Sequence, residues 1–333
     1  MATSAAPPAK VFTTPSGKPD VRLQVFHQAF HLHSTVLKLK SEFFCKFLDS
    51  PDKVARRLEA PPGAFKYDWS TMVDGDGSWH LVGPDEGEEK YLQNFKGDVA
   101  AEIAAFEILL RAMYGLNFVV LSFEQLKLVT GMADYYRALP AFSIALKGSF
   151  FISPDLISET SSRPHEIIPI AAKIRNSLLY RECLIHTMAP WSKPRYLLIE
   201  DEDLRRLAAA AYAKLERMVW QTHSEILNEF LGFNVDAIML FQSAQLFAAR
   251  FSNTSLASGQ SGVALPQMYW LLYEEPSARV SVIFKYAIQP LMKNNLVLDR
   301  RTFEPRDVSH KESFLCLEIT DDELPWDIEH TDW

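Results

Sequence analysis

The chain has 333 residues, of which 48% are hydrophobic and 23% charged, and its formal net charge is -8 at pH 7. This composition is typical of a globular chain large enough for two domains, and it excludes general disorder. The acidic balance argues against nucleic-acid binding, because neutralising phosphates requires a basic face. The three cysteines Cys45, Cys183 and Cys316 are far apart, so neither a disulfide framework nor a paired-cysteine zinc site is expected.

The first part of the chain predicts a short arm followed by a hairpin. Residues 1–19 are rich in proline and are expected to form a flexible arm. Residues 21–25 and 30–32 alternate between apolar and polar side chains, which predicts two half-buried strands joined by a turn. Ser34 and Ser41 are each predicted to cap a short helix, and the phenylalanines of the second helix are expected to seal a helical layer over the strands.

A second hairpin is expected within residues 61–97, as an insertion. Residues 65–73 and 79–81 alternate on either side of the turn sequence at 74–77. The Asp-x-Asp start of this turn is also found in calcium loops. However, the sixth position of such a loop requires glycine and here holds Trp79, so a plain turn is favoured.

The apolar period becomes helical from Asp98 onward. It predicts one helix that ends at Gly115 in a left-handed cap. A second helix is predicted to begin at Ser122 with a capping box, and with Leu121 and Leu126 as an apolar staple. Pro140 is expected to divide this helix from a short third one, which runs through Leu146 and ends at Gly148.

The second half of the chain has almost wholly helical patterns. One helix is expected over residues 170–186, a long one from Asp201 to Gly232, and another over 234–251, followed by a surface loop at 252–262. We therefore expect a mainly α-helical domain over residues 164–315. Residues 316–333 form an acidic tail that is expected to stay solvated.

The order of strand, strand, paired short helices, hairpin, helix and helix resembles the BTB/POZ fold, an α+β fold with a small sheet and a helical layer. The matching segment spans residues 20–152, and the hairpin insertion is most similar to fungal BTB proteins with a helical C-terminal half. The residues that carry the resemblance, with a structural role, are Asp20, Val21, Leu23, Phe30, His33, Leu37, Ser41, Phe44, Phe106, Leu110, Tyr114, Ala133, Asp134 and Tyr135.

The resemblance implies a protein–protein interaction protein without catalytic activity. One role that it implies is an adaptor that joins a cullin-type ubiquitin ligase scaffold to a client, docking through the core helices and a following helical pair. The alternative is a self-associating scaffold or regulatory protein without a ligase role. Corepressor-binding members carry Lys or Arg where this chain has Ser34, and they swap an N-terminal strand for which the proline-rich arm is a poor candidate.

The residues indicate no enzyme, cofactor or metal site. No nucleophile elbow, phosphate loop or zinc-protease motif occurs. Cys183 and His186 stand three residues apart on a predicted helix, but a buried and inert cysteine is favoured over a nucleophile pair. Without a signal sequence or a long apolar run, the predicted compartment is the cytosol or the nucleus, with no membrane partner.

Overall fold

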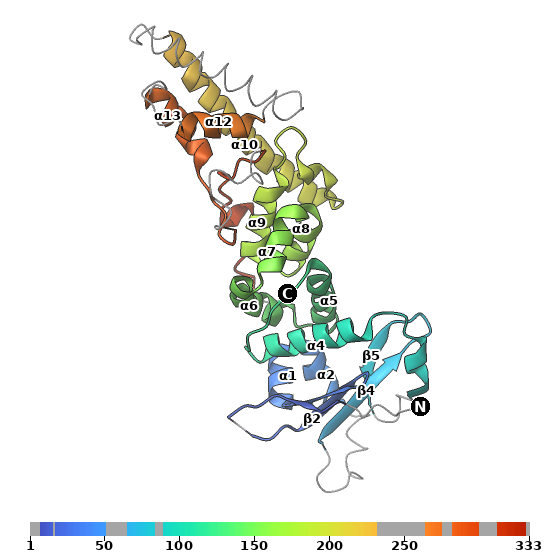
Figure 1. Ribbon diagram of the computed structural model, residues 1–333. Helices are drawn as coiled ribbons and strands as arrows, with labels where there is room; N and C mark the ends of the chain where they lie inside the picture. Colours follow the sequence, from blue (N-terminus) through green and yellow to red (C-terminus); the bar gives the residue numbers. More distant parts are fainter. Residues whose placement is uncertain are drawn as a thin grey trace. The chain divides into compact units, whose positions relative to one another are not determined.

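The computed structural model divides the chain into two compact units, Met1–Ser153 and Pro154–Asp332. Figure 1 shows the ribbon of both units, with the strands of the first unit in blue to cyan. Together they form an α+β protein with a small mixed sheet and many helices. No helix of the described part is both long and apolar enough to cross a membrane. The structure describes residues 7–15, 17–50, 65–83, 89–231, 264–274, 282–299 and 312–330.

The first unit contains a five-stranded sheet with the strand order β1-β3-β2-β4-β5. The predicted strands are confirmed, because every second residue of β2, β3 and β4 is buried. The pair β2–β3 is antiparallel, whereas β4 runs parallel to β2 and pairs antiparallel with β5. The second hairpin thus continues the sheet of the first. The strands are β1 (Lys10–Val11), β2 (Val21–Val25), β3 (Gln28–Leu32), β4 (Tyr67–Val73) and β5 (Trp79–Val82).

The N-terminal arm is not a flexible segment over residues 7–15, and that expectation was wrong. Strand β1 pairs in parallel with β3, and the backbone N–H of Phe12 donates to the carbonyl of His31 at 3.0 Å. The Phe12 side chain is buried, and its ring lies 4.9 Å from that of Tyr114. One buried aromatic anchor therefore holds a two-residue strand in place.

Two short helices, α1 (Ser34–Lys40) and α2 (Glu42–Phe47), follow the first hairpin. Ser41 caps α2 as predicted, since its hydroxyl accepts a hydrogen bond from the backbone N–H of Phe44 at 3.1 Å. Ser34 does not cap α1. It is the first residue of the helix, and its backbone N–H and hydroxyl both donate to the Asp20 carboxylate.

Helix α4 (Val99–Met113) begins where the helical period was predicted to start, its N-cap is Asp98, and it is followed by Gly115 with φ +65. Helix α5 (Phe123–Tyr135) is capped by Ser122, but Leu121 is exposed, so the predicted staple was wrong. Helix α6 (Leu139–Ser149) runs through the glycine expected to end it. The short 3-10 segments are η2 (Glu89–Asn94) and η3 (Phe150–Ile152).

The second unit is helical. The single helix expected over residues 170–186 is two helices, because Arg175 has φ 47 and turns the chain between α8 and α9. The long helix after Asp201 is confirmed, whereas the predictions for 234–251 and 252–262 lie outside the described residues. The elements are α7 (Pro154–Ser162), α8 (Pro164–Lys173), α9 (Ser177–Thr187), η4 (Arg195–Leu198), α10 (Glu202–Leu231), α12 (Leu265–Glu274), α13 (Val282–Ile288), η5 (Gln289–Met292) and η8 (Asp321–Glu323).

Candidate functional site

Most of the residues that carry the BTB/POZ resemblance form the core of the first unit. Side chains from the sheet, the short helices and the helical pair α4–α5 are all buried, so their role in the structure is packing. Ser41 is buried as well, and its hydroxyl donates to the backbone carbonyl of Tyr136 at 2.5 Å. The fully buried apolar members of the set are Val21, Leu23, Phe30, Leu37, Phe44, Phe106, Leu110 and Ala133.

Hydrogen bonds between His33 and Tyr114 tie the start of α1 to the end of α4. The Tyr114 hydroxyl accepts from the backbone N–H of His33 at 2.7 Å and lies 3.1 Å from His33 Nδ1. His33 Nε2 lies 3.1 Å from the carbonyl oxygen of Gly17, and the His33 side chain is buried. Burial raises the pKa of Tyr114 to about 12, so the phenol stays protonated at neutral pH. These contacts are structural.

Tyr135 is the member of the set that faces solvent. Its side chain is 52% exposed, whereas Asp134 beside it is half-buried. The Tyr135 ring lies 5.6 Å from the ring of Phe43, which in turn lies 4.9 Å from that of Phe47. We call Phe43, Phe47 and Tyr135 the aromatic patch. Phe47 is 39% exposed, so the expectation that it seals the helical layer was wrong.

A cleft of about 640 Å³ borders the aromatic patch, because Tyr135 lines both. Its wall comes from the β4–β5 hairpin with Trp79, from Phe95 and from Glu102 on α4. Its floor is the face of α5 that presents Lys127 and Gly131. This volume is within the range of sites that hold a small ligand or a few side chains of a partner.

The carboxylate of Glu102 is the half-buried charge of this cleft. The indole N–H of Trp79 donates to Glu102 Oε2 at 3.1 Å. Burial raises the pKa of Glu102; the hydrogen bond from Trp79 opposes this rise and the nearby Asp98 carboxylate adds to it. Burial and the Asp98 charge therefore both disfavour the ionised Glu102 carboxylate, and a bound cation would stabilise it.

Cys183 and His186, the pair weighed as a nucleophile and its base, both lie on α9 in the second unit. The thiol is fully buried in α9, and burial raises its pKa well above the ordinary value. His186 lies on the same helix and is also buried. Since the thiolate is the nucleophile, a thiol with a raised pKa is inert at neutral pH. Across the described ranges, no group of three or more His, Cys, Asp or Glu side chains could hold a metal ion.

Glu182, beside Cys183, was missed by the sequence reasoning. Its side chain is 1% exposed, and its carboxylate accepts hydrogen bonds from the backbone N–H groups of Val297, Leu298 and Asp299 at 3.0, 3.0 and 2.9 Å. This holds the segment of residues 297–299, which follows η5, against helix α9. A glutamate in the middle of a helical pattern gives no signal of such a partner, since the donors come from 115 residues away.

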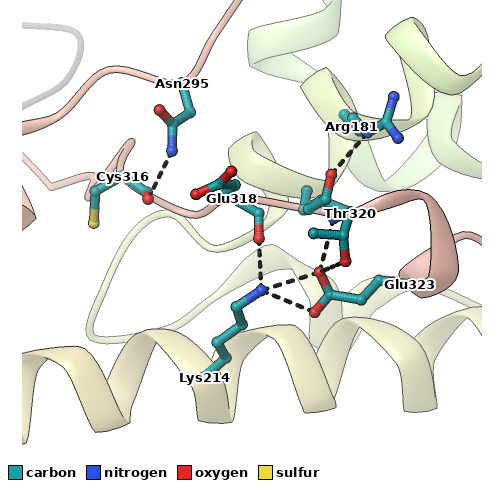
Figure 2. A network of polar contacts seen from close by, with 8 residues as sticks. Arg181, Lys214, Asn295, Cys316, Glu318, Thr320 and Glu323 are labelled. Atoms are coloured by element: carbon teal, nitrogen blue, oxygen red, sulfur yellow. Dashed lines mark hydrogen bonds and ion pairs between the residues drawn. The ribbon is translucent and has the colours of Figure 1, made fainter.

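The acidic tail is held against the second unit, and the expectation that it stays solvated was wrong over residues 316–324. Leu317, Ile319 and Leu324 are buried. Figure 2 shows Lys214 of α10 donating to the Glu318 carbonyl at 2.7 Å and to both oxygens of Glu323 at 3.0 Å. Arg181 of α9 also attaches this segment to the second unit, since its side chain donates a hydrogen bond to the Ile319 carbonyl at 2.9 Å.

No protein-family model, no curated protein and no solved structure matches this chain. The class that the fold defines is an α+β protein with a five-stranded mixed sheet and a helical second unit. The BTB/POZ resemblance stays a prediction from the motifs.

Proposed function

We propose that this chain is a non-catalytic interaction protein of the BTB type that serves as an adaptor between a cullin-type ubiquitin ligase scaffold and a client. The observation that carries the proposal is the aromatic patch, which lies where helices α2 and α5 of the predicted BTB segment meet. The element order of the first unit supports it, since it follows the order that the resemblance implies.

The patch has the chemistry of a protein-binding surface. Large aromatic side chains supply much of the binding energy of interfaces, and grouped exposed apolar side chains on one face of a protein indicate a partner. Leu39 at the end of α1 is 77% exposed and adds to the apolar side chains of the short helices. We infer that the short helices and α5 bind the ligase scaffold.

The helical second unit gives separate support to the proposed adaptor role. Cullin adaptors of the family use a helical pair after the BTB core, and α8 and α9 form a closely packed pair at the beginning of the second unit. Ile167, Ile168 and Ala171 of α8 are buried together with Leu179 and Cys183 of α9.

Affinity purification of the tagged full chain, followed by mass spectrometry, tests the proposal. We expect recovery of a cullin with the wild-type chain and its loss with Phe47→Glu, which places a charge in the aromatic patch. Leu198→Glu is the matched control, because Leu198 is exposed in the second unit. Absence of any cullin, or equal recovery with Phe47→Glu, would overturn the adaptor role.

A second candidate function, self-association, is favoured by strand β1. The sequence argued against a swapped N-terminal strand, but β1 does form a strand and pairs with β3 at the edge of the sheet. The same pairing can be made by β1 of a second copy without any new kind of contact.

Light scattering on the full chain tests this candidate. A dimer at micromolar concentration that becomes a monomer in Phe12→Pro would support it, because proline removes the N–H that donates to the His31 carbonyl. Thr13→Pro, one residue further along, is the control. A monomeric wild-type chain would exclude self-association.

A further inference from the structure

We propose that the cleft between the β4–β5 hairpin, α4 and α5 binds an arginine side chain presented by a protein partner. The inference deepens the proposed function and rests on it, since it names the chemistry of one segment that the adaptor recognises. It uses residues of the first unit alone.

The charges of the cleft favour a cation. Glu102 and Glu124 line it against a single ammonium, that of Lys127, which leaves an excess of one negative charge. Asp98 and Asp74 add to the negative potential, because each acts on a lining residue, Glu102 and Tyr135 respectively. The Trp79 indole N–H donates one hydrogen bond to Glu102, on Oε2. A carboxylate accepts several hydrogen bonds, so Glu102 keeps capacity for a charged donor.

The aromatic walls favour a planar cation. Trp79 is held in place because its ring lies 5.3 Å from that of Phe26 and 6.2 Å from that of Phe106. Phe95 lies 4.9 Å from the same Phe26 ring. Since these rings are fixed before a ligand arrives, little ordering entropy is lost on binding. Guanidinium stacks on aromatic faces and donates paired hydrogen bonds to a carboxylate, whereas the ammonium of lysine is a more strongly hydrated point charge.

Gly131 leaves the space that such a side chain needs. It lines the cleft from the middle of α5, and a Cβ built on it would meet no atom within 4 Å. Tyr135 stands four residues later on the same helix face, and Lys127 four residues earlier. A glycine in a helix interior lowers stability relative to alanine. The stability of α5 therefore does not explain Gly131, whereas the open space that it leaves in the cleft fits a bound side chain.

The test is a titration of the full chain, labelled with ¹⁵N at tryptophan, with N-acetyl-arginine amide. The indole N–H signal of Trp79, assigned by its loss in Trp79→Phe, reports on the cleft because this group contacts Glu102. We expect a saturable shift with this probe and a much smaller one with N-acetyl-norleucine amide, which has an unbranched apolar side chain without the charge. Equal shifts with both probes would show an apolar groove without charge selection, and would overturn the proposal.

Three variants locate the binding. Glu102→Gln should weaken binding of the arginine probe by about tenfold, the loss expected for one charged hydrogen bond. Gly131→Phe should abolish it by filling the dent, and Gly131→Ala, the matched control, should keep it because alanine leaves the cleft open. Unchanged thermal unfolding of each variant excludes a folding defect. Unweakened binding in both Glu102→Gln and Gly131→Phe would contradict the inference.

The inference and the proposed function fail separately. If the chain recovers a cullin while the arginine probe leaves the Trp79 signal unmoved, only the cleft assignment is wrong. If the probe binds but no cullin is recovered, the cleft assignment stands and the adaptor role is wrong.

Discussion

The hydroxyl of Tyr114 at the end of α4 accepts a hydrogen bond from the backbone N–H of His33 at 2.7 Å, although 81 residues separate them in the chain. This bond joins the helical layer to the end of the first hairpin, where α1 begins. A buried backbone N–H that loses its acceptor costs free energy, because water cannot replace the partner.

Tyr114→Phe should therefore lower the free energy of unfolding by about 1–2 kcal/mol. Urea denaturation monitored by circular dichroism measures the change. Tyr135→Phe is the control, since the Tyr135 side chain is half exposed and should change stability by less than about 0.5 kcal/mol. Equal effects of the two substitutions would contradict a structural role of the Tyr114 hydroxyl.

Phe106→Ala should destabilise the chain by about 3 kcal/mol, because it removes a fully buried ring and leaves a cavity. The ring packs 5.7 Å from that of Phe30 and 5.5 Å from that of Tyr136. Ile144→Ala, at an exposed position of α6, is the control and should be nearly neutral. The same denaturation experiment decides, and a neutral Phe106→Ala would contradict the packing of this core.

Glu182→Gln should lower the free energy of unfolding by about 1–3 kcal/mol. The amide nitrogen of glutamine would face a backbone N–H, so at least one of the three donors would lose its acceptor. Hydrogen exchange should increase at Val297 and Leu298 first. Glu225→Gln, at an exposed site of α10, is the control. Unchanged protection of Val297 and Leu298 would count against this arrangement.

The attachment of the C-terminal segment should depend on pH through Glu323. Burial opposes ionisation of its carboxyl, but the hydrogen bonds from Thr320 and Lys214 outweigh it, so the pKa of Glu323 is lowered from 4.5. A carboxyl with a lowered folded pKa stabilises the fold above its unfolded pKa, and that contribution is lost as the pH falls through the folded pKa.

The wild-type chain should consequently be more stable than Glu323→Gln at neutral pH, and the difference should vanish as the pH falls below about 4.5. Denaturation of both chains across this range gives the comparison. Glu318→Gln is the control, because Glu318 binds Lys214 through its backbone carbonyl. A difference that grows on acidification would contradict the ion pair.

The cysteines should differ in reactivity. Burial raises the pKa of Cys183 well above its ordinary value and that of Cys316 to about 12, whereas Cys45 is exposed. Iodoacetamide at about pH 8 should label Cys45 in the native chain, and the other two after unfolding. Peptide mass spectrometry measures the labelling. Rapid native labelling of Cys183 would reopen the question of a nucleophile pair with His186.

The sequence by itself determined the local elements of this protein. Alternation of apolar residues over 21–25 and 67–73 reflects the two faces of a strand, and a cap such as Ser122 acts within three residues of itself. These signals are contained in short windows of the chain, so they could be interpreted without the fold.

The tertiary structure alone decided which elements meet. Strand β1 has two residues, too few for a periodic signal, and Phe12 holds it by a contact with Tyr114 about a hundred positions away. The cleft combines Trp79, Glu102 and Gly131 from three elements, and burial of Glu182 and of Leu317 depends on distant partners. Such contacts form only when the sheet and the helices pack together. A side chain's burial therefore depends on residues far away in the sequence and cannot be inferred from its own segment.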